Sequence, residues 1–147
     1  IIVDLPPGTG DVPLSLAQLL PLSGAVIVCT PQVVAQDDAR RAVRMFQQLG
    51  VPILGLVENM SYFVADDGKE YDLFGRGGGR QMASAMNLEF LGDIPIHPMM
   101  RIAADTGEPL KYWEINDTMS EAFDAVCTNL NAAAESSSPD HPTISIS

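Results

Sequence analysis

Two continuous apolar runs, separated by a segment with helical spacing, constrain the fold of this chain more than any other feature. Residues 25–29 read AVIVC, and residues 51–57 read VPILGLV. Uninterrupted apolar runs of this length are typical of strands buried on both faces of a parallel sheet. Between them, residues 33–49 carry apolar side chains at helical spacing, and Gly50 follows as a helix end. Strand, helix and strand in this order predict a right-handed crossover and therefore an α/β fold with a mainly parallel sheet.

Shorter patterns around this unit predict the rest of one domain. The opening residues 1–4 form an apolar run that ends in Asp4, and we expect a further strand there. Asp11 is expected to cap a short helix that Pro21 ends. The pair Asp67 and Gly68 lies between two aromatic-rich runs and predicts a β-hairpin. Helix or strand patterns follow over residues 80–86, 89–94, 99–105 and 117–134, and the Ser- and Pro-rich residues 135–147 are expected to form a disordered tail after a domain over residues 1–134.

The charge balance and the cysteine content limit the kinds of partner. The net charge is −11, from 19 acidic and 8 basic residues, which disfavours a nucleic-acid partner. The apolar runs are much shorter than the roughly 20 residues of a transmembrane helix, so no membrane span is expected. Cys29 lies inside an apolar run and is expected to be buried, and it forms no CxxC pair with Cys127. Two unpaired cysteines fit a reducing, cytoplasmic location.

The segment DLPPGTGD, residues 4–11, has the composition of a phosphate or magnesium site. A carboxylate at the carboxyl end of a strand, here Asp4, can orient the water shell of Mg²⁺. Gly8 and Gly10 would keep the following turn open to a phosphate, and Asp11 would position water. The alternative is that Asp4 only ends a strand and Asp11 only caps a helix. The spacing alone does not choose between the two.

A phosphate-binding P-loop is not found in the sequence. Gly68 and Lys69 are followed by Glu70, so the pattern GxxxxGK[ST] fails, and GRGGGR at residues 75–80 departs from GxGxxG. The chain also begins without an initiator Met. We therefore expect that it is N-terminally truncated, and that the 147-residue chain alone does not hydrolyse ATP.

Five sequence blocks in order carry a family resemblance over roughly residues 1–107. The blocks LPPGTGD, SLAQLLPLSGAVIVCTPQ, GVPILGLVENMSYF, FGRGGG and LGDIPIHPMMR resemble the Mrp/ApbC group of P-loop ATPases. These are iron–sulfur cluster carriers related to MinD and ParA. The resemblance implies the C-terminal part of a MinD-like domain with a small β-hairpin insertion. It also implies a homodimeric ATPase that uses ATP and Mg²⁺ and delivers clusters to recipient apoproteins as a carrier or assembly scaffold.

The resemblance also assigns roles to particular residues. Asn59 corresponds to the asparagine that contacts adenine, and a side-chain amide offers a donor and an acceptor to a purine edge; the alternative is a turn-forming Asn after a strand. Pro95 corresponds to the residue that packs on the adenine, although His97 stands where relatives often have Asp. The implied site is therefore Asp4 and Asp11 as catalytic residues, Asp4 also as the Mg²⁺ residue through water, and Gly8, Thr9, Gly10, Asn59 and Pro95 as nucleotide-binding residues.

The chain departs from the family at the hairpin. Many members have a CPxC pair there that holds a [4Fe–4S] cluster between two subunits, whereas this chain has VADDGKEYD at residues 64–72. Carboxylates are hard ligands and poor substitutes for thiolates at such a cluster. Cluster binding by the usual route is not expected, which leaves two alternatives: a non-enzymatic MinD/ParA-like dimerisation scaffold, or cluster ligands outside this chain. Residues 77–79, a glycine triplet, are interpreted as a hinge near a dimer interface in preference to an anion-binding nest.

Overall fold

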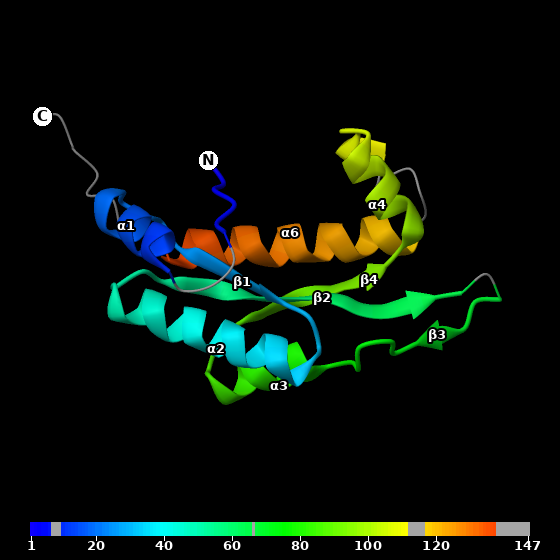
Figure 1. Cartoon of the computed structure of the whole chain (residues 1–147), viewed down its shortest axis with the longest axis horizontal. Coiled ribbons are helices and arrows are strands. Elements are labelled where there is room, and N and C mark those ends of the chain that lie inside the picture. Colours follow the sequence, from blue (N-terminus) through cyan, green and yellow to red (C-terminus); the bar gives the residue numbers. More distant parts are fainter. Residues whose placement is uncertain (7–9, 66, 112–116, 138–147) are drawn as a thin grey trace, which may run out of the picture.

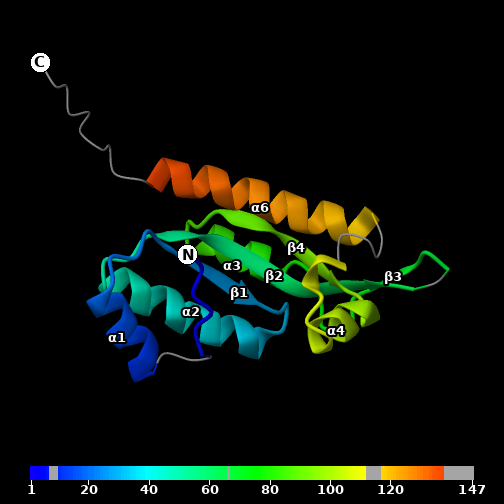
Figure 2. The same cartoon turned by 90° about the horizontal axis from the view of Figure 1, so that it is seen from above.

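The computed structural model describes residues 1–6, 10–65, 67–111 and 117–137, and it places a twisted sheet between two layers of helices (Figure 1). Helices α2 and α3 cover one face of the sheet, and the long helix α6 covers the other (Figures 1 and 2). The elements in chain order are α1 (Asp11–Leu19), β1 (Ala25–Cys29), α2 (Val33–Gln48), β2 (Ile53–Val64), β3 (Glu70–Tyr71), α3 (Gly78–Ala85), β4 (Phe90–Ile96), α4 (Pro98–Asp105), the 3₁₀ turn η1 (Pro109–Lys111) and α6 (Asp117–Ser137).

The sheet confirms the predicted parallel crossover. Strand β2 pairs in parallel with β1 on one side and with β4 on the other, while β3 pairs antiparallel with the end of β2. The pairs Phe63–Tyr71 and Val64–Glu70 form the predicted hairpin, which projects beyond the helices at one end of the sheet (Figures 1 and 2). The sheet is therefore mixed, with parallel strands at its centre.

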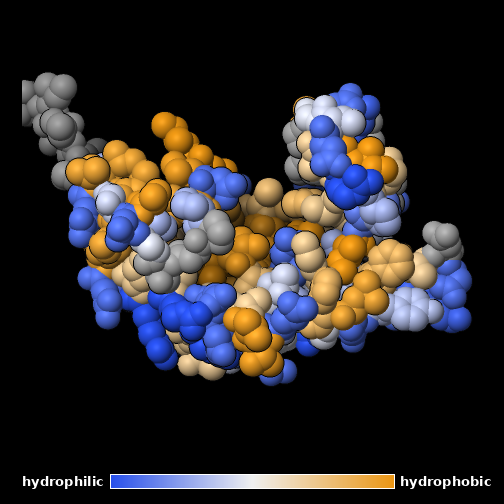
Figure 3. Space-filling view, in the orientation of Figure 1, coloured by the Kyte–Doolittle hydropathy of each residue, from blue (hydrophilic) through white to orange (hydrophobic). Residues whose placement is uncertain are grey.

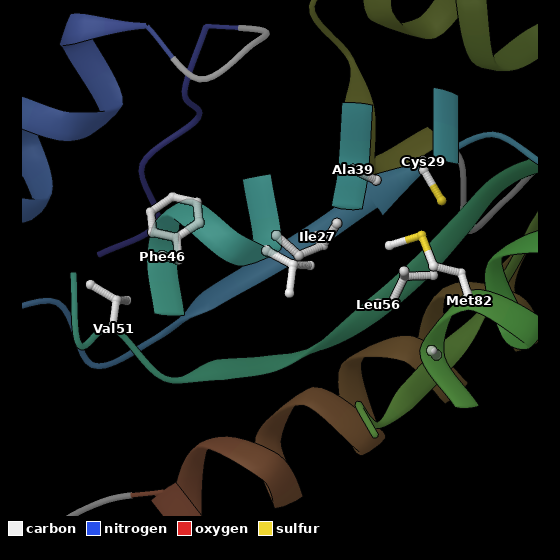
Figure 4. Packing of buried hydrophobic residues seen from close by; sticks show 9 residues of the cluster. Ile27, Cys29, Ala39, Phe46, Val51, Leu56 and Met82 are labelled. Atoms are coloured by element: carbon white, nitrogen blue, oxygen red, sulfur yellow. The ribbon is translucent and has the colours of Figure 1, made fainter. Parts of the chain in front are cut away.

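Two hydrophobic clusters hold the layers together. On the α2 and α3 face, Val43 and Met82 pack with Ile27 and Leu56 of the sheet, and neither Val43 nor Leu56 has any exposed surface (Figure 4). Full burial of a side chain of this size contributes about 1.5–3 kcal/mol. On the opposite face, α6 packs on β4 and β2 in a second cluster of Val57, Leu91, Ile94 and Met119. The first part of β2 is thus buried from both sides, as predicted, whereas Val28 of β1 is exposed.

A bulge in β4 gives α6 a polar attachment as well. The register of β2 and β4 shifts between Leu56, which pairs with Phe90, and Val57, which pairs with Gly92. Leu91 is therefore the extra residue of β4. Its carbonyl oxygen accepts a hydrogen bond of 2.8 Å from Asn129 Nδ2 of α6. The long helix is tied to the sheet at the point where the ladder is interrupted.

The prediction of a strand at residues 1–4 is wrong. Residues 1–6 have no strand pairing, and the side chains of Ile1 and Ile2 are fully exposed (Figure 3). An extended segment becomes a strand only when a neighbouring strand accepts its backbone hydrogen bonds. Among the described residues, β1 pairs only with β2, and its other edge has no strand beside it.

Other element boundaries differ from the predictions by a few residues. Strand β2 continues to Val64 instead of ending at residue 57, and β4 includes Pro95, which was expected to close it. Helix α1 begins at Asp11 with Gly10 as its N-cap, so Asp11 lies in the first turn and is not the cap. Helix α6 extends to Ser137, and residues 138–147 of the predicted tail lie outside the described residues. In the described ranges, no helix combines the length and hydropathy of a membrane span.

Candidate nucleotide site

The predicted adenine residues Asn59 and Pro95 lie on neighbouring strands at the carboxyl end of the sheet. In the β2–β4 ladder Asn59 pairs with Ile94, so Pro95 is the next residue along the adjacent strand. A cavity of about 170 Å³ is lined by Pro95 but not by Asn59; its other lining residues are Ile96 and His97 of the β4 end, Val64 and Ala65 of the hairpin, and Thr118 and Met119 of α6. Ligands of open α/β sheets bind beyond the carboxyl ends of the strands, and this edge has that position.

Asn59 is held in place by the backbone that follows it. Its Oδ1 atom accepts a hydrogen bond of 2.9 Å from the backbone N–H of Met60, and Met60 has a left-handed φ of 56°. This conformation costs a non-glycine residue about 1–3 kcal/mol and is concentrated at functional sites. Within the described residues, Asn59 Nδ2 has no hydrogen-bond partner. The side chain therefore has a fixed orientation, a free donor group and a second lone pair on Oδ1.

His97 caps the helix that follows the site. Its Nδ1 atom accepts a hydrogen bond of 3.2 Å from Met99 N at the first turn of α4, and Pro98 occupies the first helical position. Aspartate is one of the best N-cap residues because its oxygen accepts from the same backbone N–H groups. The substitution of His for the family's common Asp thus keeps a helix cap at this position.

The sequence analysis missed the most extensive buried polar contact of the site, which centres on Glu58. The side chain has no exposed surface. Its Oε1 atom accepts hydrogen bonds from Ser61 Oγ at 2.5 Å and Gly77 N at 2.8 Å, and its Oε2 atom accepts one from Gly79 N at 2.5 Å. A buried carboxylate requires such donors to offset its desolvation. An acidic residue inside an apolar strand, together with a distant glycine triplet, was the available signal.

The structure favours the nest over the hinge that the sequence suggested for residues 77–79. Gly77 has a left-handed φ of 78° and precedes α3 as its N-cap. A Cβ on Gly78 would lie 2.1 Å from Gln36 Nε2 and 2.7 Å from Pro31 O, and a Cβ on Gly79 would lie 3.0 Å from Glu58 Oε2. The glycines therefore allow close backbone approach to α2 and to a carboxylate, and the anion in the nest is a side chain of the protein itself.

The neighbouring end of β1 carries a buried thiol and a buried hydroxyl. Cys29 pairs with Glu58 in the sheet register. Burial first, and then the negative charge of Glu58, raise the pKa of the Cys29 thiol to about 11, although Arg40 opposes this. Thr30 Oγ1 is buried and lacks a hydrogen-bond partner in the described part of the chain. An unpaired buried hydroxyl at this edge suits a polar ligand or an ordered water.

The remaining predicted residues are not brought together with this site. Asp4 and Asp11 are exposed, and no ion pair or hydrogen bond connects them to Asn59 or Pro95 within the described residues. Gly10 is the N-cap of α1, while the predicted positions Gly8 and Thr9 lie outside the described residues. A single exposed carboxylate fits only an indirect Mg²⁺ role, because Mg²⁺ keeps several waters and takes further oxygens from phosphates.

The cysteines do not fit an iron–sulfur cluster. Cys29 is buried in the cluster on the α2 and α3 face, whereas Cys127 is exposed on α6, which covers the opposite face. Two thiols in opposite layers cannot ligate one cluster. In the described part of the chain, no group of three or more His, Cys, Asp and Glu side chains is arranged to hold a metal ion.

The mixed sheet and its flanking helices define an α/β protein with the MinD-like fold. MinD from Pyrococcus furiosus shares the fold, with a TM-score of 0.58 at 21% identity over 75% of this chain and 43% of that one. A family model described as ParA, the NUBPL iron-transfer P-loop NTPases, matches residues 1–131. This chain therefore belongs to that family.

Relatives agree with the assignment and are longer than this chain. An iron–sulfur cluster carrier protein of Deinococcus radiodurans is 52% identical over 88% of this chain and 37% of its own length. The mouse iron–sulfur cluster transfer protein NUBPL is 44% identical over 84% of this chain and 39% of its own length. A nucleotide-binding protein of Archaeoglobus fulgidus, solved in complex with ADP, gives a TM-score of 0.66 at 39% identity over 74% of this chain and 45% of that chain. The chain thus spans less than half the length of these relatives.

Proposed function

We propose that this chain supplies the adenine-binding part of a nucleotide-dependent iron–sulfur cluster carrier. The observation that supports this most directly is the placement of Asn59 beside Pro95 on adjacent strands at the carboxyl edge of the sheet. Membership of the NUBPL family and the ADP-bound relative support the carrier over the alternative of a scaffold that binds no cluster.

The proposed chemistry at Asn59 is recognition of the adenine edge. An asparagine amide forms a bidentate pair with adenine, accepting from N6 and donating to N7. Because Met60 N already fixes Oδ1, the amide is oriented before the ligand arrives and loses little conformational freedom on binding. Packing of the base against Pro95, which is buried in the structure, is proposed on the family assignment. Neither residue acts on the phosphates.

The phosphate side of the site is proposed on the family assignment. Asp4 would hold the water shell of Mg²⁺ beside the phosphates, residues 8–10 would follow the γ-phosphate, and Asp11 would position water. Bound ATP supplies the driving force when two copies associate as a homodimer. Recipient apoproteins accept the cluster, whose ligands lie outside the hairpin of this chain. A reducing compartment, proposed as the cytoplasm, suits both this cargo and the free thiols.

The adenine assignment is tested by replacing Asn59 with aspartate. The variant Asn59→Asp keeps the oxygen that accepts from Met60 N but replaces the free donor with an acceptor. We expect at least a tenfold loss of ADP affinity and a smaller preference for ADP over GDP, as measured by calorimetric titration. The matched control is Asn131→Asp on the exposed surface of α6. Unchanged ADP binding in the Asn59 variant would remove the assignment.

The carrier assignment needs a separate measurement. The purified protein is reconstituted anaerobically with iron and sulfide, and its visible absorption spectrum is recorded with and without a thiol-blocking reagent. We expect iron uptake only in a product of the gene that carries thiol ligands beyond Cys29 and Cys127. If no form of the protein takes up iron, the scaffold alternative replaces the carrier.

A further inference from the structure

The segment 62–76, described except for residue 66, runs from the end of β2 to Gly77 at the start of α3. It contains the end of β2, strand β3 and the loop to the glycine triplet. Its outer residues are exposed, including the large apolar side chains Tyr71, Leu73 and Phe74. Internal contacts stiffen it, because Arg76 pairs with Glu70 and lies 4.2 Å from the ring centre of Tyr62. Phe63 also pairs with Ile96 of β4, so the start of the segment remains part of the sheet.

One side chain binds residues on both sides of the segment. Ser61 Oγ precedes the segment and Gly77 N follows it, and both donate to the same atom, Glu58 Oε1. Gly79 N donates to the other oxygen, Oε2. The three contacts are buried or half-buried, so water does not compete freely for them. A carboxylate with three protein donors has little freedom to turn.

Glu58 is also the residue next to Asn59. The side chain of Glu58 points into the layer between β2 and α3, while the backbone continues directly into Asn59 and the left-handed Met60. Displacing the carboxylate therefore changes the start of the segment and the backbone that orients Asn59 at the same time.

We propose that Glu58 is a positioning residue that fastens the returning end of the segment 62–76, at Gly77, to β2 beside Ser61 and thereby sets the position of Asn59. The contacts carry the first part of this inference, and its consequence for adenine binding rests on the proposed function. Glu58 acts through Asn59 and the segment, and it does not itself contact a nucleotide.

The test uses Glu58→Gln in the full chain. Glutamine has the same shape, but its NH₂ group would face either the Gly79 N–H or the pair formed by Ser61 and Gly77, so that donors oppose donors. Hydrogen exchange of individual amides is measured by NMR. We expect exchange at Gly77 and Gly79 to become about tenfold to a hundredfold faster. The loss of a hydrogen bond to a charged group lowers local stability by an amount that corresponds to about this change in rate. The control is Glu89→Gln, whose side chain is exposed.

Three readouts separate a positioning role from general stabilisation. Exchange in the core of β1 and β4 is expected to stay as in the parent chain, whereas the Met60 amide and the Asn59 side-chain resonances shift in Glu58→Gln only. Unchanged exchange at Gly77 and Gly79, or equal acceleration throughout the sheet, would overturn the proposal. If Glu58→Gln does not fold, Ser61→Ala removes one donor without leaving a donor unpaired, and the same local acceleration is expected there.

Failure of the proposed function gives a different result. In that case ADP leaves the Asn59 resonances of the parent chain unmoved, while the exchange results for Glu58→Gln and Glu89→Gln are unaffected.

Discussion

Substitution by alanine should have different effects at Gly77 and Gly78. Gly77 requires glycine because of its backbone conformation, whereas Gly78 requires it because of close neighbouring atoms. Gly77 has a φ of 78°, but nothing lies within 4 Å of a Cβ placed on it. Gly78 does not have a positive φ, but its Cβ would lie 2.1 Å from Gln36 Nε2 and 2.7 Å from Pro31 O. We predict that Gly78→Ala is the more damaging change.

The magnitudes follow from these contacts. In Gly77→Ala the cost is the left-handed conformation alone, about 1–2 kcal/mol. In Gly78→Ala the methyl group must displace the Gln36 amide, which donates to Pro31 O at 2.7 Å, and must also push on a backbone carbonyl. A lost buried hydrogen bond costs about 1–3 kcal/mol and overpacking about 1–3 kcal/mol more. The expected total for Gly78→Ala is about 2–6 kcal/mol.

The assay is urea denaturation of the parent chain and both variants, followed by circular dichroism. Gly107→Ala is the matched control for backbone conformation, because Gly107 has a φ of 70° and open space around its Cβ. It should resemble Gly77→Ala. If Gly78→Ala is within about 0.5 kcal/mol of the parent chain, a value typical of harmless surface changes, the close approach of α3 to α2 is refuted.

Further predictions concern the core and the thiols. Leu56→Ala should lower the free energy of unfolding by about 3–5 kcal/mol, because the side chain has no exposed surface; an effect below about 1 kcal/mol in urea denaturation would contradict the packing. At pH 8, iodoacetamide should label Cys127 before Cys29, since Cys29 is buried with a pKa of about 11, and peptide mass spectrometry reports the order. Because the folded state holds the Cys29 proton more tightly than the unfolded chain, whose thiol has a pKa of 9.0, this group should lower stability as pH rises from about 9 to 11. Cys29→Ser should reduce that loss in denaturation curves at each pH.

The core of the fold could be predicted because its signals are local. The runs AVIVC and VPILGLV and the helical spacing between them depend only on neighbours in sequence, and β1, α2 and the first part of β2 form where expected. Strand formation at residues 1–4 depends on a neighbouring strand, and an apolar run does not show whether such a strand is present. The same limit applies to Asp4, whose predicted position at a strand end required that strand.

The candidate site likewise contains residues that could be assigned from the sequence and one that could not. Asn59 and Pro95 were assigned through the family resemblance alone, and the ladder, which pairs Asn59 with Ile94, places them on adjacent strands. Glu58 could not be assigned to the glycine triplet, because these contacts join residues 19 and 21 positions apart and depend on how α3 returns to the sheet. An acidic residue in a strand buried on both faces should itself prompt a search for such donors.

The unpaired edge of β1 has a consequence for how the chain behaves in solution. Among the described residues no strand pairs with this edge, Val28 of β1 is 59% exposed, and the apolar residues Ile1 and Ile2 of the N-terminal segment are exposed. A strand edge with apolar side chains is a template for a second strand from another molecule. Association of this kind depends on concentration, whereas folding of the core does not. If the chain associates at high concentration, we expect this edge rather than the core to be the place of contact.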